Sequence, residues 1–165
     1  TVNAGPVVVQ AMFLQTPKST GSVQIITADP LTEPRLNLGM YSDGPFNVAG
    51  TDLNYAVNAF KVAKDIASAA GSIVVSPSQD VYDRGDGALA DAAQTNPNLV
   101  VASHITGTAR MGKTIADGVV DSNLHVFGVQ NLMIADLSVY PEEPNANTVH
   151  SAYMIAQTAA EILGV

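Results

Sequence analysis

Two side chains in the last third of the sequence occupy positions where ligand sites commonly form. His104 follows the apolar segment LVVA (99–102), which we expect to be a strand. Asn147 begins a predicted helix, after a predicted strand that ends in Asp136. Ends of strands and N-termini of helices are where sheets with helices place ligands. Because a helix N-terminus presents N–H groups and a partial positive charge, this arrangement suits an anion or an electron-rich ring.

Other familiar chemical patterns are absent from the sequence. The histidines His104, His125 and His150 have no HExxH spacing, so we expect no metal site. There is no GxSxG elbow for a serine nucleophile, and no GxGxxG or GxxxxGK[ST] loop to cradle phosphate. Without cysteine there is no disulfide, thiolate metal site or cysteine nucleophile.

The acidic pair Glu142 and Glu143 lies between two prolines. Two adjacent carboxylates could form a paired acid–base site, but neighbouring side chains need not converge. We interpret this segment as a solvated loop.

The composition excludes several classes of protein. The chain has 165 residues, 47% of them hydrophobic, and 7 basic and 15 acidic residues give a net charge of −8. This composition is too apolar for a disordered chain. The sequence has no apolar run of ~18 residues that could form a membrane-spanning helix. Its net negative charge argues against binding to nucleic acid. We expect a soluble chain without a signal segment. With only 13% charged residues, either uncharged polar residues cover the surface or one flank packs against another polypeptide.

Apolar spacing predicts three helices. The first follows an N-cap at Thr51 and stops at Gly71, a shorter one covers 87–95, and the last runs from Asn147 to Leu163 before Gly164. We expect residues 79–86 to form a polar loop.

Extended segments are predicted between these helices. We expect residues 7–15 and 22–27 to form an antiparallel hairpin, with a further short strand at 36–40. Later short strands are expected at 118–121, 124–129 and 131–136. Early strands, central helices and a mixed C-terminal part indicate an α+β fold.

Several stretches resemble the C-terminal signature of the glucose–methanol–choline (GMC) flavoprotein oxidoreductases. They are SHITGTARMG (103–112), GVVDSNLHVFGVQNLMIADLSVYP (118–141) and NANTVHSAYMIAQTAAEILG (145–164). The segment GSVQIITADPLTEPRLNLGMYSD (21–43) resembles that family's substrate-domain hairpin. The resemblance covers most of the chain in order, and the 43-residue spacing from His104 to Asn147 fits the family's catalytic pair.

The resemblance implies roles for individual residues. His104 would be the catalytic base and Asn147 its partner, a His–Asn version of the pair. Asp136 and Leu137 would lie beside the flavin of FAD, and the backbone of Asn147 and Thr148 would approach its pyrimidine side. His125 stands where the family has an arginine.

The resemblance also implies an architecture. Residues 1–100 would form the substrate-binding part, an antiparallel sheet with helices. Residues 101–165 would carry the catalytic segment and return the last strand and helix to an FAD-binding α/β domain. The family's GxGxxG half is missing from these residues, so a second polypeptide or the front of a cleaved precursor would supply it.

The implied reaction is oxidation of an alcohol or sugar hydroxyl to a carbonyl, with hydride passing to the flavin. Two alternatives stay open: a lyase of the same family with a redox-silent flavin, and a non-catalytic subunit.

Overall fold

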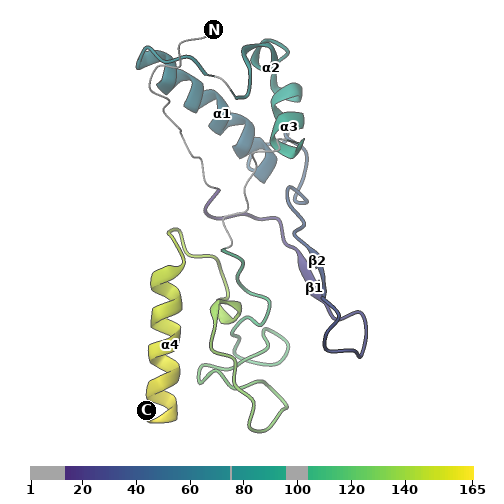
Figure 1. The fold of residues 1–165 in the computed structure, drawn as a ribbon, viewed down its shortest axis with the longest axis vertical. Coiled ribbons are helices and arrows are strands. Elements are labelled where there is room, and N and C mark those ends of the chain that lie inside the picture. Colours follow the sequence, from purple (N-terminus) through teal and green to yellow (C-terminus); the bar gives the residue numbers. More distant parts are fainter. Residues whose placement is uncertain (1–13, 75, 96–103) are drawn as a thin grey trace. The chain divides into compact units, whose positions relative to one another are not determined.

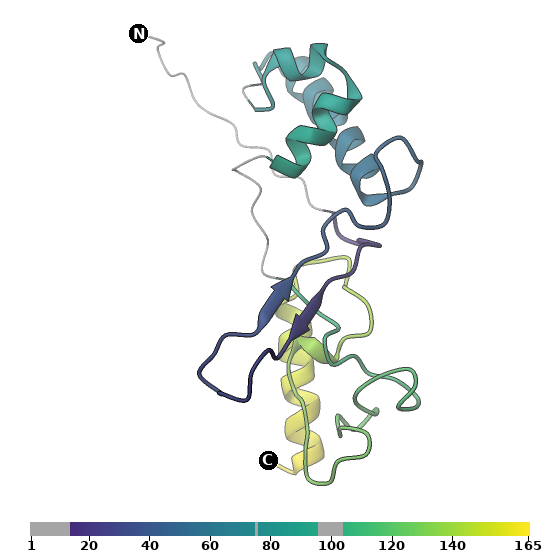
Figure 2. The ribbon, with the colours of Figure 1, turned by 90° about the vertical axis from the view of Figure 1, so that its right-hand side faces the viewer.

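The computed structural model describes residues 14–74, 76–95 and 104–165. These residues fall into two compact units (Figures 1 and 2). One is helical and spans residues 40–95 without residue 75, and the other combines residues 15–39 with 104–165. The predicted division into a substrate-binding part (1–100) and a catalytic segment (101–165) is a division by function and stays a prediction. The described residues contain a two-stranded antiparallel sheet and four α-helices, so the α+β class is confirmed.

The helical unit is built around the long helix α1 (Asp52–Ala69). Thr51 is its N-cap as predicted, because its hydroxyl accepts a hydrogen bond from the backbone N–H of Asn54 at 3.3 Å. Gly71 follows the last turn with a φ of 70°. This positive φ ends the helix where the sequence predicts.

Two shorter helices complete this unit. The helix α3 (Asp86–Thr95) agrees with the prediction for residues 87–95. The polar loop predicted for 79–86 is wrong in part, because α2 (Gln79–Asp83) forms one helical turn there. This short turn has no buried residue, so no apolar spacing marked it as helical.

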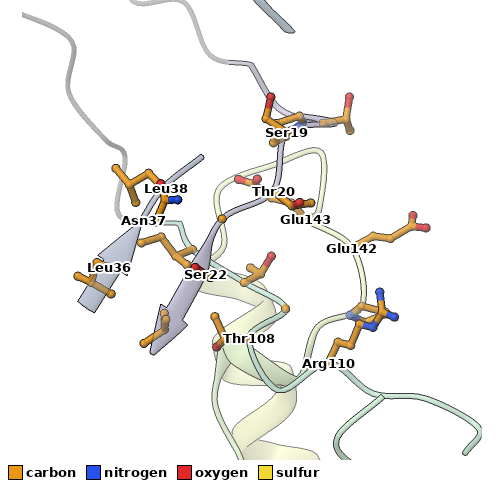
Figure 3. A pocket seen from close by; sticks show the side chains of 18 residues that line it. Ser19, Thr20, Ser22, Leu36, Asn37, Leu38, Thr108, Arg110, Glu142 and Glu143 are labelled. Atoms are coloured by element: carbon orange, nitrogen blue, oxygen red, sulfur yellow. The ribbon is translucent and has the colours of Figure 1, made fainter. Parts of the chain in front are cut away.

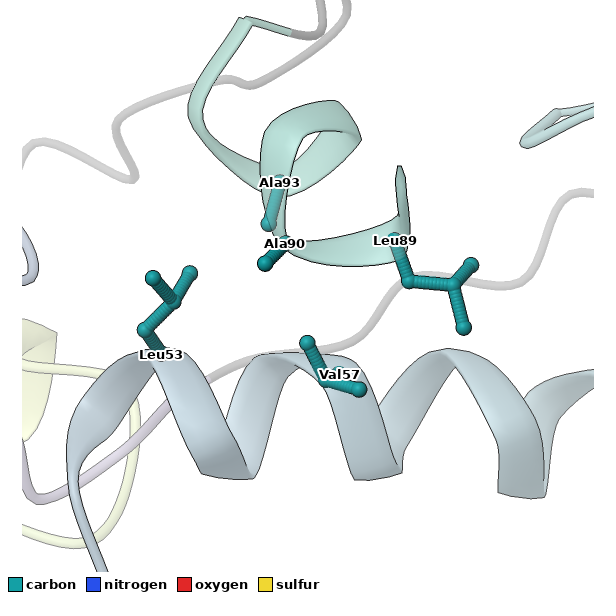
Figure 4. Close-up of a cluster of buried hydrophobic side chains, with 5 residues drawn as sticks. All are labelled: Leu53, Val57, Leu89, Ala90 and Ala93. Carbon is teal, nitrogen blue, oxygen red and sulfur yellow. The ribbon is translucent and has the colours of Figure 1, made fainter. Parts of the chain in front are cut away.

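The core of the helical unit lies between α1 and α3 (Figure 4). Leu53 and Val57 lie one turn apart on α1 and point toward Leu89, Ala90 and Ala93 of α3. All five side chains are buried. Small alanines on α3 let the two helices approach closely, so this contact accounts for the unit's packing.

The sheet of the second unit pairs two of the predicted strands. Its strands are β1 (Ser22–Gln24) and β2 (Arg35–Asn37), paired antiparallel with Val23 opposite Leu36. The predicted strand at 22–27 therefore pairs with a later segment, and the predicted strand at 36–40 begins one residue earlier. The predicted partner at 7–15 lies almost entirely outside the described residues. The segment at 99–102 lies outside them as well.

The strands predicted between residues 118 and 136 are wrong as continuous strands, including the last strand, which was expected to end at Asp136. These residues form isolated bridges that pair Val120 with Val126 and His125 with Met133. Leu124 and Asn131 adopt positive φ values of 65° and 61°, which reverse the chain and interrupt each extended run. The segment is therefore a compact set of turns.

The helix α4 (Val149–Leu163) packs on these turns. Ile155 and Ala159 of α4 share a buried cluster with Val120, Leu124 and Val139. Gly164 ends the helix in the left-handed conformation, as predicted. None of the helices in the described residues has the length and apolar character needed to cross a membrane.

Candidate active site

Backbone hydrogen bonds anchor the segment that follows His104. The N–H of Ala109 donates to the carbonyl of Ser138 at 2.9 Å, and the N–H of Met111 donates to Val139 at 2.8 Å. On the other side, the N–H of Val119 donates to the carbonyl of Arg110 at 2.8 Å. The segment at 109–112 is thus held between two others, which fixes the base of the loop that carries His104.

A cavity of about 550 Å³ lies beside this loop (Figure 3). It is lined by one side of the β1–β2 hairpin, by residues 105–110 and by residues 141–143. Its charged lining residues are Arg110, Glu142 and Glu143. Six hydroxyl side chains also line it: Thr16, Ser19, Thr20, Ser22, Thr106 and Thr108. A cavity with several hydroxyls and few charges suits a small polar molecule.

A second cavity is smaller and apolar. It measures about 240 Å³ and lies between α4 and the turns, with lining residues that include Met111, Leu124, Met154 and Ile155. No charged side chain lines it. The larger cavity is therefore the better candidate for chemistry.

His104 is half-buried and directly precedes Ile105 and Thr106, which line the larger cavity. Burial raises the pKa of the Glu143 carboxyl, and the nearby imidazole partly lowers that pKa again.

Asn147 lies at the start of α4, where its side chain has a structural task. Its Oδ1 accepts a hydrogen bond from the N–H of Val149 at 3.0 Å. This orientation leaves Nδ2 as the donor that can reach an oxygen atom of a ligand. The next residue, Thr148, is buried and is the N-cap of α4.

Asp136 and Leu137 lie on the turn that precedes the segment leading to α4. The Asp136 carboxylate caps the short 3-10 helix η1 (Leu137–Val139) by accepting from the N–H of Ser138 at 2.8 Å. Leu137 packs against the buried cluster under α4, and η1 contacts α4. The predicted flavin-side residues therefore lie on two neighbouring elements, η1 and the start of α4.

Glu143 lies four positions before Asn147 in the sequence, so the Cα atoms of these two residues lie within about 15 Å of one another. The catalytic pairing of His104 with Asn147 and the flavin contacts stay predictions. In the part of the chain that the structure describes, no group of three or more His, Cys, Asp or Glu side chains could hold a metal ion.

The interpretation of Glu142 and Glu143 as one solvated loop holds for only one of them. Glu142 is exposed, whereas Glu143 is half-buried, and both line the larger cavity. The sequence carried no signal for this difference, because Pro141 and Pro144 flank the pair symmetrically.

Comparison with known proteins identifies the family. The family model described as GMC oxidoreductase, for its C-terminal region, matches residues 17–156. The chain therefore belongs to the GMC oxidoreductases, as the resemblance implied. Both His104 and Asn147 lie inside the matched range.

Individual relatives agree with this assignment. The chloroplastic fatty acid photodecarboxylase of Chlamydomonas reinhardtii is 34% identical over 151 residues, which are 88% of this chain and 23% of that protein. A solved formate oxidase has a TM-score of 0.72 at 27% identity, covering 89% of this chain and 25% of its own. A fungal aryl-alcohol oxidase gives the same TM-score and identity, covering 91% and 24%. The chain spans about a quarter of the length of the relatives it matches.

The relatives also support the predicted cofactor. FAD is named for an Aspergillus oryzae formate oxidase, described for its FAD modification, and for an FAD-dependent oxidoreductase from Chaetomium thermophilum. FAD is thus the cofactor of this family's members.

Proposed function

We propose that the chain supplies the catalytic base and the substrate-binding surface of an FAD-dependent oxidoreductase that oxidises an alcohol or a sugar hydroxyl. The observation that carries the proposal is the family match over residues 17–156, which includes both members of the predicted His–Asn pair. The hydroxyl-lined cavity beside His104 supports a hydroxylated substrate.

The start of α4 fits the proposed cofactor. No acidic residue lies in the first turn of α4, so its N–H groups and helix dipole can favour negative charge on a nearby ring. Asn147 and Thr148 would present the backbone there, and Asp136 and Leu137 would lie on the adjoining turn. FAD, when bound, would supply the acceptor for the hydride, and thus for the two electrons, that leaves the alcohol carbon.

In this mechanism His104 accepts the proton of the substrate hydroxyl as that carbon is oxidised. Nδ2 of Asn147 donates a hydrogen bond to the same oxygen and fixes its orientation. The amide holds this direction because its Oδ1 is engaged by the N–H of Val149. The hydrogen bond from the first residue of α4 would therefore orient the amide that holds the substrate oxygen.

We also propose that the GxGxxG-bearing FAD half is supplied by residues outside these 165, on a second polypeptide or on the remainder of a cleaved precursor. The support is that the chain matches about a quarter of its relatives and contains no GxGxxG loop. The two parts would then form one flavoprotein.

The test measures anaerobic reduction of the flavin by a panel of aliphatic alcohols, aryl alcohols and sugars in the assembled protein. His104→Ala should slow reduction about 10²–10⁴-fold while FAD stays bound. Asn147→Ala should cost about tenfold or less, because one neutral hydrogen bond contributes ~0.5–1.5 kcal/mol. His125→Ala is the matched control, since this ring is 48% exposed and outside the site. Reduction at the normal rate in His104→Ala would remove His104 from the role.

A lyase remains the second candidate, because one relative is named a photodecarboxylase and is not an alcohol oxidase by name. Substrate turnover without loss of the yellow flavin absorbance under anaerobic conditions would favour it. Absence of flavin from the assembled protein would instead favour a non-catalytic subunit.

A further inference from the structure

The 550 Å³ cavity has a charged part and an uncharged part. Its charged lining residues, Arg110, Glu142 and Glu143, all come from the segments 105–110 and 141–143. Among the described residues, those of segment 16–38 that line the cavity, on and before the β1–β2 hairpin, carry no charge. A molecule bound here therefore meets two different chemical environments.

Three large apolar side chains of the hairpin line the cavity: Val23, Leu36 and Leu38. Val23 lies directly opposite Leu36 in the antiparallel pair, so these two side chains project from the same face of the hairpin. Ile105, the residue after His104, adds a fourth apolar side chain to the lining. These four side chains, which we call the apolar wall, are 44% to 62% exposed. Covering them with the carbon atoms of a ligand is favourable.

Close backbone contacts hold the hairpin at the end where Leu38 lies. A Cβ on Gly21 would overlap the carbonyl oxygen of Asn37. A Cβ on Gly39 would overlap the carbonyl oxygen of Thr20. The Asn37 side chain also accepts a hydrogen bond from the N–H of Gly39 at 3.0 Å. The backbone that carries the apolar wall is thus held before a ligand binds, which lowers the entropic cost of binding.

A fully hydroxylated substrate fits the apolar wall poorly. A sugar ring carries hydroxyl groups around its edge, and those turned toward the wall would lose water without gaining a hydrogen bond. An alcohol with an aryl or alkyl body covers the wall with carbon atoms, while its hydroxyl stays with the polar groups. The cavity volume lies within the range of about 300–1,000 Å³ that is usual for small-molecule sites, which combine apolar lining with a few polar groups.

We propose that the apolar wall determines the substrate class: an alcohol whose carbon body is an aryl ring or an alkyl chain, in preference to a sugar. Val23 and Leu36 contact the carbon body, and the hydroxyl is directed toward the segment that follows His104. Leu36, at 62% the most exposed of the four, is a specificity-determining residue. This inference rests on the proposed function, because it assumes that the cavity beside His104 receives the substrate.

The first test measures kcat/KM for benzyl alcohol and for D-glucose by anaerobic flavin reduction in the assembled, FAD-loaded protein. The unmodified protein should prefer benzyl alcohol. Leu36→Ser should lower kcat/KM for benzyl alcohol about tenfold or more and leave that for D-glucose unchanged, because only the apolar body loses a contact. Val23→Thr, which keeps the side-chain shape, should act in the same direction, and Leu36→Met should keep most of the rate.

The matched control is Leu31→Ser. Leu31 lies in the connection between β1 and β2, is 90% exposed and does not line the cavity. This variant removes the same apolar side chain from the same hairpin. It should leave both values of kcat/KM unchanged.

The second test measures binding without turnover. The probe is 2-phenyl-2-propanol, a tertiary alcohol that cannot lose a hydride because its alcohol carbon bears no hydrogen. Titration calorimetry at several temperatures should show binding with a negative heat-capacity change, the signature of buried apolar surface. The Kd should rise about tenfold in Leu36→Ser and stay unchanged in Leu31→Ser.

Three results would overturn the proposal. They are a preference of the unmodified protein for D-glucose, equal losses for both substrates in Leu36→Ser, and loss of bound FAD in Leu36→Ser. The last result would mean that the apolar wall packs against the FAD-binding half.

The two tests also separate this inference from the proposed function. If His104→Ala reduces the flavin normally while Leu36→Ser weakens binding of 2-phenyl-2-propanol, the proposed base is wrong and the apolar wall stands. If His104→Ala is impaired while the tertiary alcohol binds Leu36→Ser and the unmodified protein equally, only the role of the apolar wall is wrong.

Discussion

Replacing Gly112 by alanine tests whether the close approach of two backbone segments after His104 requires a glycine. Gly112 and Gly118 lie where two backbone segments cross. A Cβ on Gly112 would lie 2.6 Å from the N of Gly118 and 2.8 Å from the carbonyl carbon of Asp117. These are backbone atoms, which cannot rotate away as a flexible side chain can. The two segments would have to separate.

The cost can be estimated from the contacts that the separation disturbs. Inserting a methyl group into a packed contact costs about 1–3 kcal/mol. The crossing also holds two backbone hydrogen bonds, from Gly112 to Val120 at 2.9 Å and from Val119 to Arg110 at 2.8 Å. Weakening both adds about 1–2 kcal/mol. We expect Gly112→Ala to lower the free energy of unfolding by about 2–5 kcal/mol, or the Tm by roughly 4–20 °C at this chain length.

Far-UV circular dichroism during urea and thermal unfolding measures this effect, since the chain has no tryptophan to report it. Gly87→Ala is the matched control. A Cβ there would meet only the Phe46 ring, at 3.9 Å, and the residue lies in α3, where alanine is favoured by up to about 1 kcal/mol. A Gly112→Ala protein as stable as the wild type, or less affected than Gly87→Ala, would refute the argument from close approach.

Two further predictions concern the helical unit. Leu89→Ala should lower the free energy of urea unfolding by about 2–5 kcal/mol, because Leu89 is 1% exposed between α1 and α3; Leu31→Ala, at a side chain 90% exposed, should stay within about 0.5 kcal/mol. Burial, and to a lesser degree the charge of Asp52, raises the pKa of Tyr41 above its usual 10.0. The folded protein then keeps the phenol proton to higher pH than the unfolded chain, so the free energy of unfolding falls as pH rises above about 10. Tyr41→Phe should reduce this fall in alkaline urea titrations, leaving the part due to Tyr82, whose pKa burial also raises. An unchanged alkaline slope in Tyr41→Phe would contradict this.

Helices stabilised by local signals could be predicted from the sequence. The cap at Thr51 and the spacing of Leu53 and Val57 are properties of neighbouring residues, and α1 begins and ends where they indicate. The turn of α2 has no buried side chain, and it lies in contact with α3. The spacing of apolar residues, which indicates a buried helix face, therefore could not predict α2.

Strand pairing was predicted less well, for a physical reason. An apolar extended pattern shows that a segment favours the β conformation, but its partner is set by contacts distant in sequence. Val23 pairs with Leu36, and the intervening residues form the connecting turns. Between residues 118 and 136 the reversals at Leu124 and Asn131 left single bridges in place of strands.

The candidate site shows the same division. His104 and Asn147 came from a pattern along the chain that resembles a family, and the comparisons confirm that family. Glu143 came only from the structure, because burial distinguishes it from Glu142 and no local sequence property does. The hydrogen bond that Asn147 Oδ1 accepts from the N–H of Val149 likewise required coordinates, since the same amide could have turned outward.

The exposed surface bears on the proposal of a second FAD-binding part. Large apolar side chains lie open on α4 and on the hairpin segment, among them Tyr153 at 75% exposure and Ile25 at 89%. A chain with only 13% charged residues has few groups to offset such exposure. Packing against the FAD-binding half would bury these side chains beside the elements that carry Asn147 and the cavity wall. The same association that stabilises the surface would then bring the base, its partner amide and the flavin into one site.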